Sequence, residues 1–228
     1  MTEDSFALKK EQDRLRERFL KYTRRAFRCI PPITNPQILD VGCGSGLPTI
    51  TLAQLSGGHI TGVDIDAEAL RRLHQYAAES GVADRVHTVQ GSLMKMDFSD
   101  ASFDIIWAEG SIAVIGFKQG LQAWKRFLKP EGYLVVHDEA GDIDQKVGQI
   151  AACGYELVEF FEVGNEVWWE EYYAPLNDVV QQLKKKGAQD PALEAGLERA
   201  QREIDGYQVH PERYHSVYFI MRKGASQD

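Results

Sequence analysis

The chain has little cysteine and no long apolar run. Its 228 residues include three cysteines, Cys29, Cys43 and Cys153, which are odd in number, widely spaced and without a CxxC pair. Neither a disulfide framework nor a thiolate metal site is therefore expected. The apolar stretches are far shorter than the roughly 18 residues of a membrane-spanning helix, and none follows a charged start as in a secretion signal. These absences predict a cytoplasmic protein with reduced thiols, no metal and no membrane span.

The chain also lacks an excess of basic residues. Its net charge is −8, from 26 Lys and Arg against 34 Asp and Glu. Residues 1–30 carry nine basic and five acidic residues (+4), which leaves 17 − 29 = −12 on residues 31–228. An acidic body repels polyanions, so nucleic acid is not expected as a partner. The basic stretch at 9–28 is interpreted as a solvated helix face. It also permits an alternative, in which tRNA or a protein is the acceptor.

Short apolar runs alternate with helical patterns over the middle of the chain. Strands are expected at 37–42, 59–64, 86–91, 103–108 and 132–138. Because these runs are apolar on both faces, they favour a parallel sheet covered by helices on both sides. The fold class expected is α/β, with a doubly wound Rossmann-like sheet. The helical stripes between the strands are Leu70/Leu73/Ala77, Leu121/Trp124/Leu128 and Ile143/Val147/Ile150/Ala151.

Both ends of the chain depart from this alternation. A stripe of Leu15, Phe19, Tyr22 and Ala26 predicts an N-terminal helix before the Pro31-Pro32 pair. Two further strands are expected at 155–163 and 216–223, with about 50 residues between them. The whole chain, 1–228, is expected to form one domain, in which 1–30 is a capping helix, 164–214 a helical insertion and 215–223 the final strand. The insertion carries the stripes Leu176/Val179/Val180/Leu183 and Leu193/Leu197/Ala200/Ile204.

The most informative segment is the glycine-rich run LDVGCGSG at 39–46, between an expected strand and an expected helix. Glycines in such a turn let a ligand approach the backbone. A dinucleotide loop requires G-x-G-x-x-G, and that register fails because Leu47 or Thr49 holds the last position. A Walker phosphate loop requires a lysine after the glycines, and none follows. What remains is an acid, Asp40, followed by three alternate glycines.

On these residues the chain resembles the class I S-adenosylmethionine (SAM)-dependent methyltransferases, and it looks most like small-molecule members related to the ubiquinone and menaquinone C-methyltransferases. DVGCGSG matches the first motif of that family, and the resemblance covers about residues 36–165. It implies a SAM-binding core at 36–163, SAM as cofactor, S-adenosylhomocysteine (SAH) as product and a small-molecule methyl acceptor. It also implies a seven-stranded sheet, mostly parallel, whose last strand is antiparallel.

The resemblance also assigns cofactor-binding residues. Gly42, Gly44 and Gly46 would let the backbone pass under the methionine and ribose, and Asp40 would attract the cationic part of SAM. Asp64 ends the second expected strand and would accept both ribose hydroxyls, with a strand-end turn residue as the alternative.

The adenine-binding part of the motif is weaker. Ser92 stands where relatives carry an acid, and a hydroxyl accepts the adenine amino hydrogen bond less strongly. Ile65 and Leu93 are expected as apolar walls for the base, or otherwise as ordinary core. Asp66 is expected to cap the helix that follows it rather than to bind ligand.

Two residues that follow expected strands are candidates for catalysis. Ligands of such folds bind at the carboxyl ends of the strands, where Glu109 and His137 lie. Each is a candidate general base, and Glu109 is also a candidate cofactor contact. The alternatives are a carboxylate at a helix N-terminus for Glu109 and a buried strand histidine for His137. The sequence NPPY is absent after the fourth strand, which argues against amino methylation of DNA or of protein glutamine.

The insertion opens with a segment rich in aromatics. Trp168, Trp169, Tyr172 and Tyr173 are expected to form a lid that binds the acceptor, or otherwise only to pack the insertion. Such a lid would suit an amine or cationic acceptor. Besides the tRNA or protein methyltransferase, a SAM- or SAH-binding protein without catalysis remains as an alternative. The sequence does not indicate whether the protein is a monomer or an oligomer.

Overall fold

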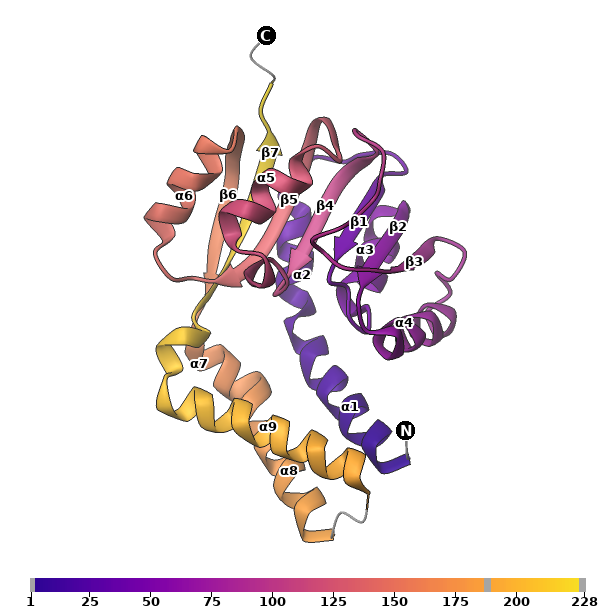
Figure 1. Ribbon diagram of the computed structural model, residues 1–228, viewed down its shortest axis with the longest axis vertical. Helices are drawn as coiled ribbons and strands as arrows, with labels where there is room; N and C mark the ends of the chain where they lie inside the picture. Colours follow the sequence, from indigo (N-terminus) through magenta and orange to yellow (C-terminus); the bar gives the residue numbers. More distant parts are fainter. Residues whose placement is uncertain (1–2, 187–189, 226–228) are drawn as a thin grey trace. The chain divides into compact units, whose positions relative to one another are not determined.

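The structure is a computed structural model that describes residues 3–186 and 190–225 (Figure 1). The ends of the expected single domain (1–2 and 226–228) and residues 187–189 of the expected insertion lie outside this range. Within it the chain divides into two compact units. The sheet unit comprises Leu20–Asp138, Asp142–Phe161 and the chain from Val217 onward. The helical unit comprises the chain up to Phe19, Glu139–Gly141 and Glu162–Ser216.

A seven-stranded sheet of order β3-β2-β1-β4-β5-β7-β6 organises the sheet unit. The pairs β1–β2, β1–β4, β2–β3 and β4–β5 are parallel, and β7 is antiparallel, which confirms the expected fold class. The central strand is buried on both faces, because Ile38, Leu39 and Val41 have no exposed surface. The strands are β1 Gln37–Val41, β2 His59–Asp64, β3 Val86–Gln90, β4 Phe103–Glu109, β5 Leu128–Glu139, β6 Tyr155–Val163 and β7 Ser216–Lys223.

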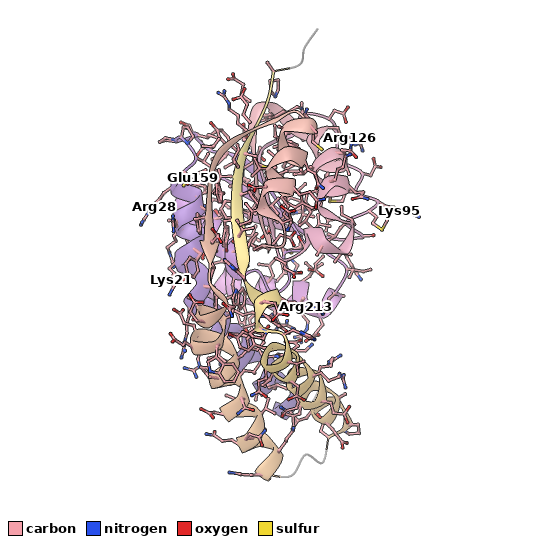
Figure 2. The ribbon with its side chains drawn as sticks, turned by 90° about the vertical axis from the view of Figure 1, so that its left-hand side faces the viewer. Lys21, Arg28, Lys95, Arg126, Glu159 and Arg213 are labelled. Atoms are coloured by element: carbon pink, nitrogen blue, oxygen red, sulfur yellow. The ribbon has the colours of Figure 1, made fainter. Side chains whose placement is uncertain are left out.

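Helices cover both faces of this sheet. Figure 2 shows α2 (Leu20–Arg28) on one side of β6 and β7, with Lys21 and Arg28 pointing away from the strands, and α5 and α6 on the other side. The opposite face of α2 is buried through Thr23 and Ala26. Asp66 caps α4 by accepting from the N–H groups of Glu68 and Ala69, as expected. The remaining helices of this unit are α3 Leu47–Ser56, α4 Ala67–Glu79, the 3-10 helix η2 Ile112–Val114, α5 Phe117–Lys125 and α6 Ile143–Ala152.

The helical unit contains the first helix and the insertion. Its two longer insertion helices, α8 (Ala174–Lys186) and α9 (Pro191–Val209), match the two predicted stripes, and Asp190 caps α9. The buried stripe residues include Leu176, Val180, Leu193, Leu197, Ala200 and Ile204. The other elements are α1 Glu3–Arg16, η1 Glu17–Phe19, α7 Asn165–Trp168, η3 Trp169–Tyr173 and η4 Pro211–Tyr214.

Two expected elements differ in detail. The N-terminal stripe is not one helix, because the 3-10 turn η1 separates α1 from α2 and the two helices lie in different units. The stripe that ends at Leu128 was also wrong at its last residue. The helix α5 ends at Lys125, and Leu128 opens β5 opposite Phe103. Its pairing with β4 therefore decides the conformation of Leu128, although its spacing from Trp124 also suits a helix.

None of the helices in the described ranges is long and apolar enough to cross a membrane.

Candidate functional site

The glycine loop joins β1 to α3 with three glycines in the left-handed region. Gly42, Gly44 and Gly46 have φ angles of +76°, +54° and +84°. A Cβ at Gly42 would overlap Ser111, and one at Gly46 would overlap Leu73, so the packing of the protein itself requires both glycines. A Cβ at Gly44 would meet nothing within 4 Å. Gly44 therefore faces open space, which is what a backbone that receives a ligand requires.

The Asp64 carboxylate holds this loop from the end of β2. Its Oδ2 accepts from the Gly44 N–H at 2.8 Å, and its Oδ1 accepts from the Asp66 N–H at 2.9 Å. Each carboxylate oxygen can accept a second hydrogen bond. Asp64 thus positions the loop, and it retains acceptor capacity for the ribose hydroxyls that the sequence predicts it to bind.

Asp40 lies buried at the base of the loop. Its side chain is 2% exposed, and Thr49 Oγ1 on α3 donates to its Oδ2 at 2.5 Å. Burial raises the pKa of Asp40 to about 7; the Thr49 hydrogen bond opposes this rise, and the negative charges of Glu109 and Asp64 add to it. Three carboxylates therefore gather around the glycine loop, an arrangement that favours a cationic ligand.

The residues expected around adenine lie close to this loop. Ile65, which follows Asp64, is 72% exposed, so it does not belong to the core. Leu93 is partly buried, and its Cδ1 lies 3.7 Å from where a Cβ on Gly42 would be. The hydroxyl of Ser92 accepts from the Met94 N–H at 3.3 Å. Adenine binding by these residues stays a prediction, and an exposed isoleucine beside Asp64 is compatible with it.

Glu109, the last residue of β4, is fixed by side chains from three elements. Thr23 Oγ1 of α2 and Trp107 Nε1 of β4 each donate to its Oε1 at 2.8 Å, and the Tyr218 hydroxyl of β7 also bonds to it. Burial raises the pKa of Glu109, while the three hydrogen bonds oppose that rise. These side-chain donors explain its position better than the helix N-terminus considered from the sequence. Sequence reasoning missed Thr23, Trp107 and Tyr218, because each reads as an ordinary core position.

His137 on β5 lies beside Glu109 in the sheet. The two are paired in the strand register, and the His137 ring stacks on Tyr218 at 4.1 Å with 7° between the planes. Only 9% of His137 is exposed, and burial lowers its pKa to about 3. Its imidazole is therefore neutral at neutral pH. This is the buried strand histidine of the alternative interpretation, and its catalytic role stays a prediction.

The four aromatic residues of the insertion lie in the helical unit, in and beside a π-helix. The segment Trp169–Tyr173 is that π-helix, a form often found at functional sites. Tyr172 and Tyr173 are buried, and Trp169 stacks on Tyr207 at 5.2 Å. Trp168 stacks on Phe19 at 4.3 Å. These rings clearly pack the unit together, and their role in acceptor binding stays a prediction.

The structure thus brings part of the expected site together in the sheet unit. The loop glycines, Asp40, Asp64 and Glu109 are linked by hydrogen bonds or by mutual charge. The described residues contain no group of three or more His, Cys, Asp or Glu that could hold a metal ion.

Comparisons with known proteins agree with this geometry. The family model described as a methyltransferase domain matches residues 38–132. A sterol 24-C-methyltransferase, ERG6B of Gibberella zeae, is 36% identical in an alignment 151 residues long, which covers 54% of this chain and 40% of that protein. The chain therefore spans about two fifths of the length of this relative.

Two solved structures share the fold. A SAM-dependent methyltransferase from Geobacter sulfurreducens, in complex with SAH, has a TM-score of 0.72 at 20% identity, covering 89% of each chain. The cyclase SpnF has a TM-score of 0.73 at 22% identity, covering 90% of this chain and 81% of its own. The fold alone therefore does not determine the reaction. The match of residues 38–132 to the model of a methyltransferase domain agrees with the resemblance to class I SAM-dependent methyltransferases, and the shared fold is the one that this resemblance implies.

Proposed function

We propose that this protein transfers a methyl group from SAM to a small-molecule acceptor and releases SAH. The observation that carries this proposal is the glycine loop: Gly44 is open to a ligand, and its N–H is bound to the Asp64 carboxylate. A loop without a phosphate-binding lysine and with three carboxylates around it suits a cation that has no phosphate. SAM has a sulfonium, an ammonium and a carboxylate, and it would supply the electrophilic methyl group.

A small-molecule acceptor is supported by the sterol-methylating relative and by the acidic body of the chain. We infer that Trp168, Trp169, Tyr172 and Tyr173 take part in acceptor binding, on the support of the π-helix in this segment. We also infer a cytoplasmic location, supported by the free cysteines Cys29, Cys43 and Cys153 in the described residues.

Isothermal calorimetry tests the proposal directly. The purified protein should bind SAH and SAM with micromolar-range affinity and should not bind NAD or ATP. Absence of heat with SAH, or equal heat with NAD, ends the methyltransferase interpretation. Production of SAH from SAM, screened against a panel of metabolites, then separates an enzyme from a protein that only binds SAM or SAH. Salt-dependent binding of tRNA would favour the macromolecular alternative.

A further inference from the structure

Glu109 lies in a polar cluster that draws on four elements of the sheet unit. The cluster consists of Glu109 and Trp107 on β4, Thr23 on α2, Tyr218 on β7 and His137 on β5. Thr23 lies 86 residues from Glu109 in the chain. So many donors from separate elements fix both the position and the rotamer of one carboxylate.

Thr23 reaches this carboxylate because of the way α2 is placed. Its exposed face carries Lys21 and Arg28, which point away from the sheet (Figure 2). Its buried face presents Thr23, which has no exposed surface, to the end of β4. The helix is therefore more than a cover for the sheet, since it supplies one hydrogen bond to the carboxylate at the carboxyl end of a central strand.

The aromatic part of the cluster restricts the Glu109 carboxylate further. Tyr218, 1% exposed, stacks between His137 and Phe161, with ring centroids 4.1 Å and 4.9 Å away. Its hydroxyl lies within reach of both Thr23 and Glu109; since Thr23 donates its own proton to Glu109, the single proton of Tyr218 is available to the Glu109 carboxylate. Rings held in such a stack have little rotamer freedom, so the hydroxyl keeps its place.

We propose that Thr23, Trp107 and Tyr218 are positioning residues for Glu109, and that Glu109 accepts the proton of a methyl acceptor that carries an N–H or O–H group. This inference rests on the proposed function. An ionised carboxylate only accepts hydrogen bonds, so its natural partner is a donor, such as an amine or a hydroxyl. His137 is a poor rival, because burial keeps its imidazole neutral and weakly basic.

The chemical step balances with Glu109 in this role. A lone pair of the acceptor nitrogen or oxygen forms the bond to the methyl carbon, while the C–S bond breaks and its electron pair returns to sulfur. The proton of the acceptor passes to the Glu109 carboxylate, and the products are the methylated acceptor and SAH. Positioned general bases contribute about 10²–10⁴-fold to such steps.

Several groups around Glu109 affect its titration. Asp40 on β1 repels it, burial raises its pKa, and the Thr23, Trp107 and Tyr218 hydrogen bonds lower it. Two further titratable groups lie nearby: His137 on β5, which belongs to the cluster, and Tyr22 on α2, which acts on Tyr218 from outside it. Removing one donor should therefore raise the pKa of Glu109.

Carboxyl NMR tests the positioning role without any acceptor. In protein labelled with ¹³C at the glutamate carboxyl, the Glu109 signal is the one lost in Glu109→Gln. Its titration midpoint should rise by about one pH unit in Thr23→Val and in Tyr218→Phe. It should stay unchanged in Thr23→Ser, which keeps the hydroxyl, and in Thr51→Val, a buried threonine on the neighbouring helix α3. Midpoints that do not move in Thr23→Val and Tyr218→Phe overturn the positioning role.

SAH production against a panel of amines and phenols tests the proton-acceptor role. The wild type should turn over at least one of them, and Glu109→Gln should lower the turnover rate at least 100-fold. In Thr23→Val the acidic limb of the pH–rate profile should move to higher pH, by the same amount as the NMR midpoint of Glu109. The SAH affinity of Thr23→Val should stay within threefold of the wild-type value. Full turnover by Glu109→Gln, or no turnover of the panel by a wild type that binds SAH, overturns this role. A wild type that does not bind SAH refutes the proposed function instead, and the NMR result still decides the positioning role.

Discussion

Gly44 and Asp64 are joined by a hydrogen bond of 2.8 Å from the backbone N–H of the loop to the carboxylate that ends β2. The residue predicted to hold the ribose therefore also holds the loop that receives the ligand. Its other oxygen accepts the Asp66 N–H, so both oxygens are fixed before any ligand binds. A site organised in this way loses little conformational freedom on binding.

This relationship predicts the effect of Asp64→Ala. The variant should weaken SAH binding by roughly 1.5–3 kcal/mol, because hydrogen bonds to a charged group are lost. Calorimetry with SAH measures the change. Asp66→Ala is the matched control: it removes the α4 cap and about 1 kcal/mol of stability, yet it should leave SAH affinity unchanged. If Asp64→Ala and the wild type bind SAH with equal affinity, Asp64 is only a turn residue at the end of the strand.

Two of the loop glycines, Gly44 and Gly46, predict different consequences of substitution. Gly44→Val should abolish SAH binding and leave the protein folded, because its side chain enters open space and adds only the roughly 1–2 kcal/mol cost of a left-handed residue. Gly46→Ala should instead lower the melting temperature, since its methyl group overlaps Leu73. Thermal unfolding with and without SAH distinguishes the two. A Gly44→Val protein that binds SAH normally is incompatible with a ligand over this loop.

Most helices and strands were predictable from the sequence, because the spacing of apolar residues indicates which side chains are buried. The limits of β6 and β7 agree with the predicted 155–163 and 216–223. The break between α1 and α2 was not predictable, because the apolar stripe runs through the 3-10 turn without a change of spacing. Leu128 was misplaced since its spacing from Trp124 suits a helix, while pairing with β4 places it in a strand.

Only those residues of the candidate site that belong to a recognisable sequence motif were predictable. The glycines, Asp40 and Asp64 lie within about 25 residues of one another, in a pattern with known chemistry. Two of the three donors to Glu109, Thr23 on α2 and Tyr218 on β7, are more than 80 residues away from it in the chain, and nothing in their local sequence distinguishes them from core. The π-helix depends on a hydrogen-bond register that apolar periodicity does not report.

The raised pKa of Asp40 predicts a pH dependence of stability. From its ordinary value of 3.8 up to about 7, folded Asp40 holds a proton that the unfolded chain has lost. Its contribution to the free energy of unfolding therefore falls as pH rises through this window, by at most about 1.4 kcal/mol per pH unit, and levels off above it. Asp40→Asn should lack this slope. Urea unfolding of both proteins from pH 5.5 to 8, without ligand, gives the difference, and parallel curves would contradict the prediction.

The aromatic segment of the helical unit predicts a separation of cofactor binding from turnover. Trp169 is only partly buried, whereas Tyr173 is 7% exposed among Tyr172, Tyr207 and Tyr214, so the tryptophan is the safer position to change. Trp169→Ala should leave SAH affinity within about threefold, which is under roughly 0.7 kcal/mol, while turnover of the acceptor collapses.

Trp169→Phe is the matched control, because it keeps a ring that can stack on Tyr207 and should retain most of the turnover. The circular dichroism of both variants shows whether the helices persist. If Trp169→Ala keeps its helices and also its full turnover, Trp169 only packs the helical unit. If it keeps its helices and loses turnover at unchanged SAH affinity, the ring acts on the acceptor, since a packing defect would have lowered the helix content or the stability as well.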